Sequence, residues 1–288
     1  MPKITRPNSR TSKKSASPAS SSSAQQKNDK PTPLAIYLDL SQRPLQVLIF
    51  LLPLLILYEL GTLLFLSSQG MREIVLARLM LTQLLDAFGA AGFHLPPVLL
   101  CVVLLCWHAV YKPKPQMPKG SFSGNVMLGM SIESFLWAIP LVILGSILSQ
   151  GLSGSGGNLL PFVQSAQPGS SPNELGLMAR LTLSIGAGLY EELVFRWVLI
   201  ALIHFICADL LTTGEHWAYA IAIVLSSIAF AFYHNLRIGP GADLSIPLFI
   251  TYTLGGAYFA LLFVLRGFGI VVATHATYDI IALALLTR

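Results

Sequence analysis

Three short clusters of polar residues interrupt the apolar second half of this sequence, and their side chains are of the kinds that perform acid–base chemistry. Their ionisable members are Glu191, Glu192, Arg196, His234, His275 and Asp279. Carboxylates and imidazoles that share a site can activate water, exchange protons or bind a metal ion. Because ionisable groups at membrane depth are costly, they usually face the interior of a helix bundle, and each is a candidate for function.

Helical spacing separates the two glutamates. Residues in an α-helix turn by about 100° each, so Glu192 and Arg196, at i and i+4, lie on one face and can form an ion pair. Glu191 points about 140° away from Arg196, which leaves it free for chemistry as a general base. His275 and Asp279 are also four residues apart. That spacing lets both point at one atom, or lets the acid orient the imidazole.

The three clusters read EExxxR, FxxxH and HxxxD, in that order on successive hydrophobic segments. Together they resemble the CPBP family of intramembrane proteases, which includes the type II CAAX prenyl endopeptidases and the bacteriocin-processing and self-immunity homologues. The resemblance covers residues 176–286. It implies an endopeptidase that acts within or beside the membrane on a membrane-associated peptide or protein. It also allows a lipidated substrate and CAAX-type processing of a C-terminus.

The resemblance also implies a role for each residue. Glu191 would activate the attacking water, and His234 would hold that water or share its proton. His275 would stabilise the oxyanion that develops on the scissile carbonyl, a contribution often worth about 3 kcal/mol. Glu192 and Arg196 would support the site.

The last motif position departs from the family pattern, which commonly has Asn where this chain has Asp279. An ionised Asp cannot donate a hydrogen bond, so direct donation to an oxyanion would require a protonated acid. Otherwise Asp279 can accept from His275 and fix its tautomer. The clustered acids and histidines are also plausible zinc ligands, but no HExxH motif is present. We therefore expect no cofactor, with a zinc metalloprotease as the alternative.

The composition predicts a protein embedded in a bilayer. Of 288 residues, 54% are hydrophobic and only 11% are charged, against about 25% charged in a soluble domain. Seven apolar runs are long enough for helices that cross a hydrocarbon core of about 30 Å. They are approximately 45–67, 95–111, 125–149, 176–208, 217–234, 247–265 and 268–286.

Two stretches leave the helix count open. Residues 74–91 are less apolar and form either an interfacial amphipathic helix or an eighth span. The run 176–208 is too long for one perpendicular span, so it is tilted, kinked or extended along the surface. The expected fold class is all-α, a multi-pass integral membrane helical bundle with 7–8 transmembrane helices.

The chain divides into four parts. Residues 1–44 form a disordered basic tail with a net charge of +6, while the remainder sums to −1, which gives no support for nucleic acid as a partner. Residues 45–149 hold the N-terminal transmembrane helices, 150–175 form a Gly/Ser-rich loop, and 176–286 form the catalytic bundle. Because cytoplasmic segments are rich in Lys and Arg, we expect a cytoplasmic N-terminus, in a bacterial cell membrane or, in a eukaryote, the endoplasmic reticulum.

Other function classes remain open. A proton-coupled transporter or channel could use the same buried Glu, His and Asp residues, and a non-catalytic scaffold could use them as a structural ion-pair network. Inverted repeats would favour a transporter, and inspection of the sequence finds none.

Several further residues favour structural roles. Glu59 and Glu133 lie in the first and third apolar runs, where interhelical hydrogen bonding is favoured over lining of a substrate cavity. Gly188 and the pair Gly255 and Gly256 are expected to permit close helix packing or a bend. Tyr190 and Trp197 are expected to be packing or membrane-interface aromatics.

Overall fold

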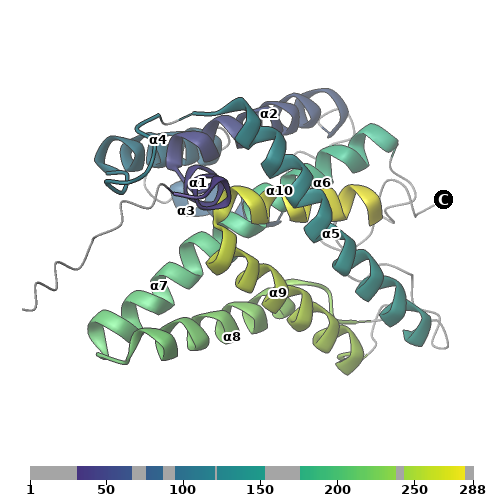
Figure 1. The fold of residues 1–288 in the computed structure, drawn as a ribbon. Helices are drawn as coiled ribbons and strands as arrows, with labels where there is room; N and C mark the ends of the chain where they lie inside the picture. The colour runs from purple at the N-terminus through teal and green to yellow at the C-terminus, as the bar shows by residue number, and fades with distance from the viewer. Residues whose placement is uncertain are drawn as a thin grey trace, which may run out of the picture. The chain divides into compact units, whose positions relative to one another are not determined.

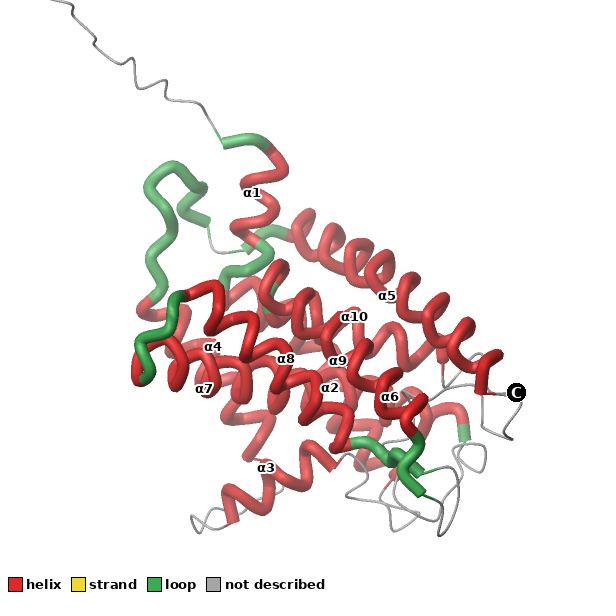
Figure 2. The backbone as a smooth tube through the Cα atoms, turned by 90° about the horizontal axis from the view of Figure 1, so that it is seen from below, coloured by secondary structure: helices red, strands yellow, loops and turns green. Residues whose placement is uncertain are grey.

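The computed structural model describes residues 31–66, 76–86, 95–120, 122–152, 176–237 and 243–282. Its α-helices are α1 (Pro33–Leu40), α2 (Pro44–Gly61), α3 (Leu76–Asp86), α4 (Leu95–Val110), α5 (Gly124–Leu152), α6 (Leu177–Glu192), α7 (Ala201–His204), α8 (Glu215–Tyr233), α9 (Ile246–Arg266) and α10 (Phe268–Asp279). Three π-helical segments continue them, η1 (Thr62–Leu66), η7 (Leu193–Ile200) and η8 (Phe205–Leu210). Figure 2 draws helices and loops in these ranges and no strand, which confirms the all-α class.

The described ranges contain five helices long and apolar enough to cross a membrane. They are Pro44–Leu66, Gly124–Ile147, Leu177–Leu210, Glu215–Tyr233 and Ile246–Arg266. The apolar helices Leu95–Val110 and Phe268–Ala282 are shorter. The predicted multi-pass membrane bundle is therefore confirmed, but the predicted count of seven or eight spans is not confirmed.

Helix α3 is the part of the stretch 74–91 that the structure describes. It has 11 residues, which at 1.5 Å per residue is about half the length needed to cross a hydrocarbon core. Within those residues the structure therefore favours the amphipathic helix over an eighth span.

The predicted boundary of the N-terminal tail at residue 44 is wrong, because helix α1 lies inside the predicted tail. The Thr32 hydroxyl accepts a hydrogen bond from the backbone N–H of Ala35, and Pro33 occupies the first turn, where its missing N–H costs nothing. Behind α1, Arg43 is 2% exposed and pairs with Asp39 at 2.7 Å. Residues 1–30 and 153–175, which include most of the predicted tail and loop, lie outside the described residues.

The long apolar run at 176–208 forms one helical stretch, Leu177–Leu210, which passes through α6, η7, α7 and η8 (Figure 1). Its first π-helical segment begins at Leu193, directly after the glutamate pair. π-Helical turns inside α-helices are rare and occur often at functional sites. The excess length predicted from the sequence therefore belongs to a continuous helix with widened turns.

Helix α10 is the most enclosed element near the polar clusters. It packs against α5, α6, α9 and α2, and all of its residues are buried except Thr277. Its contact with α6 depends on Gly188, where an added Cβ would lie 2.7 Å from the backbone nitrogen of Ala276. Gly256 likewise lets α9 approach the backbone of Ser227 in α8. These contacts confirm the close packing that was expected at Gly188 and Gly256.

Candidate active site

The six predicted site residues come together in one buried cluster. Helix α6 and η7 supply the glutamate pair and the arginine, the residue after α8 is the first histidine, and α10 supplies the second histidine and the aspartate. Their exposed fractions are Glu191 1%, Glu192 0%, Arg196 0%, His234 5%, His275 1% and Asp279 3%. Three chain segments far apart in the sequence therefore place six polar side chains away from the lipid-facing surface.

Glu192 connects the first and third motifs. Its Oε2 lies 3.1 Å from Arg196 Nε, the ion pair that the i, i+4 spacing predicts. Its Oε1 accepts a hydrogen bond of 2.6 Å from His275 Nδ1. Arg196 is held further by the Gly256 carbonyl at 3.3 Å and lies 4.2 Å over the Phe230 ring. Glu192, rather than Asp279, therefore holds the Nδ1 side of His275.

Glu191 faces both imidazoles. Its Oε2 lies 3.8 Å from His234 Nε2 and 4.0 Å from His275 Nε2. These separations exceed the roughly 2.7–3.2 Å of a direct hydrogen bond, but each is short enough for one oxygen atom, about 2.8 Å from both groups, to bridge Glu191 to that imidazole. Arg196 pairs with Glu192, so Glu191 is the glutamate that faces the two histidines.

The histidine tautomers follow from their partners. His234 Nδ1 lies 2.8 Å from the carbonyl oxygen of Phe230, and a carbonyl can only accept, so Nδ1 carries the proton. That leaves His234 Nε2 directed at Glu191, buried and without a hydrogen-bond partner in the part of the chain that the structure describes. By the same reasoning, His275 Nδ1 is protonated because Glu192 accepts from it.

Asp279 completes the cluster beside Nε2 of His275, the nitrogen that also faces Glu191. Its Oδ2 lies 3.5 Å from His275 Nε2, while its Oδ1 is buried and has no hydrogen-bond partner within the described ranges. Three carboxyl groups therefore surround one imidazole, and Arg196 is the single guanidinium paired with any of them among the described residues.

Aromatic side chains form the walls of the cluster, and these contacts were not predicted from the sequence. The Tyr252 ring stacks on His234 at 4.2 Å, and Phe259 stacks on His275 at 4.4 Å. The Tyr233 hydroxyl donates to Glu191 Oε1 at 3.3 Å. An aromatic residue in an apolar helix looks the same whether it packs against lipid, core or an imidazole. The one available signal was the position of Tyr233 directly before the motif histidine.

The two acids outside the motifs make interhelical hydrogen bonds, as expected. Glu59 of α2 pairs with Arg78 of α3 at 3.0 Å and accepts from the Tyr190 hydroxyl at 3.3 Å. Glu133 of α5 accepts from Arg266 of α9 at 2.7 Å and from the hydroxyl of Tyr37 in α1. These basic and phenolic partners were not predicted from the sequence.

The described residues contain no group of three or more His, Cys, Asp or Glu side chains arranged to hold a metal ion. The expectation of a site without a cofactor is untested by this observation and stays a prediction.

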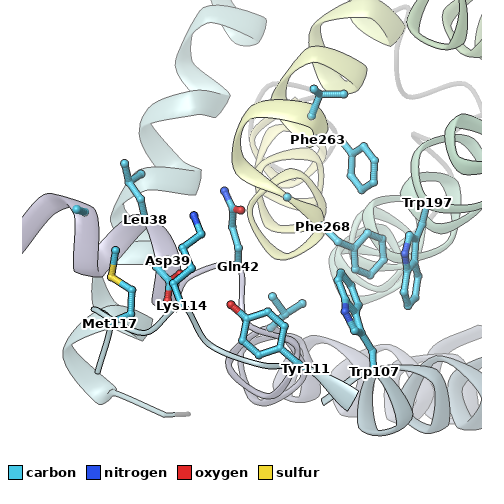
Figure 3. A pocket seen from close by; sticks show the side chains of 14 residues that line it. Leu38, Asp39, Gln42, Trp107, Tyr111, Lys114, Met117, Trp197, Phe263 and Phe268 are labelled. Carbon is cyan, nitrogen blue, oxygen red and sulfur yellow. The ribbon is translucent and has the colours of Figure 1, made fainter. Parts of the chain in front are cut away.

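A separate pocket of about 570 Å³ is lined by residues of α1, α2, α4, α9 and α10 and by Trp197 of η7 (Figure 3). Trp107, Trp197 and Phe268 form an aromatic wall, with ring centroids 6.2 Å and 5.0 Å apart along the stack. Asp39 and Lys114 are among its few polar lining residues. Trp197 directly follows Arg196, and Phe268 begins the helix that carries His275, so the pocket and the cluster share two helices.

Comparison with known proteins gives a family match over the C-terminal part of this membrane bundle. Residues 173–281 match the family model described as Type II CAAX prenyl endopeptidase Rce1-like. The matched segment includes all six cluster residues, confirms the resemblance to the CPBP proteases and supports a membrane protease as the enzyme class. No curated protein and no solved structure matched the chain.

Proposed function

We propose that this protein is an intramembrane endopeptidase in which Glu191 activates a water molecule for attack on a peptide carbonyl. The observation that carries the proposal is the position of Glu191 Oε2, within 4.0 Å of Nε2 of both His234 and His275. Arg196 meanwhile pairs with the neighbouring Glu192. Glu191 is thus buried beside two imidazoles while its neighbour takes the arginine.

In the first step, the water oxygen bonds to the carbonyl carbon. One water proton passes to Glu191 Oε2, and the other is held by His234 Nε2, which accepts because Nδ1 already carries its proton. The carbonyl oxygen becomes an oxyanion. His275, protonated on both nitrogens, donates Nε2–H to it, and Glu192 balances the charge from the Nδ1 side.

In the second step, the tetrahedral intermediate breaks down. Glu191 returns its proton to the amide nitrogen, the carbon–nitrogen bond breaks, and the products are a carboxylic acid and an amine. The carboxylate thus ends the cycle ready for another water, as a general base and acid must.

Asp279 serves as a protonated second donor to the oxyanion. Because Glu192 already holds His275 Nδ1, Asp279 is not needed to fix that tautomer. A neutral carboxyl group has one O–H donor and can take the place of the amide common in the family.

Replacing Glu191 tests the proposal. Glu191→Gln keeps the shape but removes the base, so cleavage of a co-expressed membrane-tethered peptide should fall by about 10²–10⁴-fold with normal expression. Glu215→Gln is the matched control, because that side chain is 70% exposed and lies at the start of α8. Unchanged cleavage by Glu191→Gln would rule out this mechanism.

The reaction as proposed needs no resident metal. Purified protein should keep its cleavage rate after prolonged chelation by 1,10-phenanthroline, and added Zn²⁺ should not raise it. Loss of activity on chelation, with recovery on adding Zn²⁺, would replace the glutamate mechanism with a zinc-activated water.

The substrate is a membrane-associated peptide or protein with a lipid group, and the aromatic pocket receives that group. Val264 lines the pocket, so Val264→Trp should fill it and raise KM for a lipidated peptide without raising KM for the unlipidated one. Val224→Trp is the control, since Val224 is 55% exposed on α8 and does not line the pocket. An equal KM for lipidated peptide in both variants would exclude this use of the pocket.

The protein sits in a bacterial cell membrane with its N-terminus in the cytoplasm. Residues 1–44 carry the +6 charge that favours this side. A cysteine introduced near the N-terminus should react with an impermeant maleimide only after the cells are opened. Labelling of intact cells would show that the N-terminus lies outside the cytoplasm.

A further inference from the structure

The Tyr233 hydroxyl lies between the proposed base and the N-terminus of helix α3. It accepts a hydrogen bond of 2.9 Å from the backbone N–H of Ala77 and donates one of 3.3 Å to Glu191 Oε1. Tyr233 is the last residue of α8 and directly precedes His234. In the FxxxH motif it occupies one of the three unspecified positions.

The direction of both hydrogen bonds is fixed by chemistry. Ala77 is the second residue of α3, and the first N–H groups of a helix have no intrahelical acceptor. An N–H can only donate, so the hydroxyl must accept from it. The single hydroxyl proton is then available for Glu191.

The N-terminal part of the chain holds α3 in place for this contact. Arg78, the next residue, is 3% exposed and pairs with Glu59 of α2 at 3.0 Å. Its guanidinium also lies over the rings of Tyr58 at 5.0 Å and Tyr190 at 5.6 Å. Tyr190 directly precedes Glu191, so α2, α3 and α6 are tied together immediately beside the base.

We infer that Tyr233 is a positioning residue for the proposed proteolysis, and that α3 orients it. By holding Oε1 of Glu191, Tyr233 leaves Oε2 as the oxygen that faces His234 and His275 and takes the proton from water. The N-terminus of α3, which carries a partial positive charge, lies behind the hydroxyl. This inference rests on the proposed function.

Removing the hydroxyl is the first test. Tyr233→Phe keeps the ring, which packs 5.1 Å from Phe195. If Tyr233 positions the base, kcat should fall by about 10–100-fold with KM unchanged, because the loss is felt in the transition state. Tyr258→Phe is the control: its hydroxyl also makes a hydrogen bond between helices, 2.6 Å to the Trp137 carbonyl, but outside the cluster.

Removing the donor from α3 is the second test. Ala77→Pro deletes the N–H at a first-turn position, where proline is compatible with a helix. It should lower kcat by about threefold to tenfold alone and have no added effect in the Tyr233→Phe background, since both changes act through one hydroxyl.

The outcomes separate the two levels of the proposal. Wild-type kcat in Tyr233→Phe, together with an inactive Glu191→Gln variant, overturns the positioning role and leaves the proteolytic mechanism intact. Independent, additive effects of Ala77→Pro and Tyr233→Phe overturn the link to α3. A wild-type protein that cleaves no membrane-tethered peptide overturns both. If Tyr233→Phe does not fold, a wild-type kcat in Ala77→Pro alone overturns the link.

Discussion

Glu133 and Glu191 are both acids within apolar helices, yet their surroundings differ. Glu133 accepts from two nitrogens of Arg266, from the Tyr37 hydroxyl and from the Trp137 indole N–H at 3.2 Å. Among the described residues, Glu191 accepts one hydrogen bond, from Tyr233, while its other oxygen faces two imidazoles at 3.8 and 4.0 Å.

The difference shows how a buried carboxylate is used. A carboxylate has about four lone-pair positions, and at Glu133 donors fill both oxygens. No lone pair of Glu133 remains to accept a proton from water, so Glu133 links α1, α5 and α9 structurally. At Glu191 one oxygen remains open toward the histidines. The number of donors around an intramembrane acid, rather than its presence, separates structure from chemistry here.

The largest difference between the two acids is expected when each is replaced by glutamine. Glu191→Gln should lower kcat by about 10²–10⁴-fold with no fall in Tm. Glu133→Gln leaves Arg266 without its ion-pair partner, so it should lose about 2–4 kcal/mol of stability while keeping kcat per folded molecule. Melting curves in detergent and cleavage assays on the same samples check both. A fall in kcat without a fall in Tm for Glu133→Gln would contradict the assignment of a structural role to Glu133.

The geometry at Glu191 depends on the α6–α10 contact, and Gly188→Ala would disturb it. The new methyl would meet backbone and side-chain atoms of α10 within 2.8 Å, so the histidine on α10 must shift. A shift of about 1 Å can cost about 10²-fold in kcat. Gly124→Ala is the control, because nothing lies within 4 Å of that added Cβ. Equal kcat in the two variants would show that the cluster tolerates movement of α10.

An intermediate effect is expected at Glu192. The amide oxygen of Glu192→Gln can still accept from His275 Nδ1, but Arg196 loses its charged partner and His275 loses its counter-charge. We expect kcat to fall by about tenfold, with KM little changed. If kcat instead fell as far as in Glu191→Gln, measured side by side, Glu192 would have to be counted as a second base.

The smallest effect is expected at Asp279. Asp279→Asn replaces a protonated donor by an amide donor, so kcat should stay within about threefold of wild type, whereas Asp279→Leu should cost about 10²-fold. The ratio of the two rates is the measurement. A large loss in Asp279→Asn would mean that Asp279 acts as an ionised acceptor.

Local arguments from the sequence succeeded where the interaction lies within one helix. The Glu192–Arg196 pair followed from i, i+4 spacing, and it is present at 3.1 Å. The all-α membrane class followed from composition and the length of the apolar runs. The tail boundary failed because a Ser- and Lys-rich composition concealed the Thr32 and Pro33 start signals of α1.

Contacts between helices were not accessible in the same way. Tyr37 and Arg266, the partners of Glu133 on other helices, lie 96 and 133 residues away from it, and the partner of His275 Nδ1 lies 83 residues away. Tyr233 and Tyr252 carry no charge, so apart from the position of Tyr233 directly before His234 nothing distinguished them from the other aromatics of an apolar helix.

The amino-acid sequence alone determined which side chains are too polar to face lipid and which of them share a helix face, because desolvation cost and helical periodicity are local properties. Only the tertiary structure decided which oxygen of which glutamate faces the histidines instead of a hydrogen-bond donor. That outcome depends on how closely α6, α8 and α10 approach, and the approach is set by packing at Gly188 and by the placement of α3 against Tyr233.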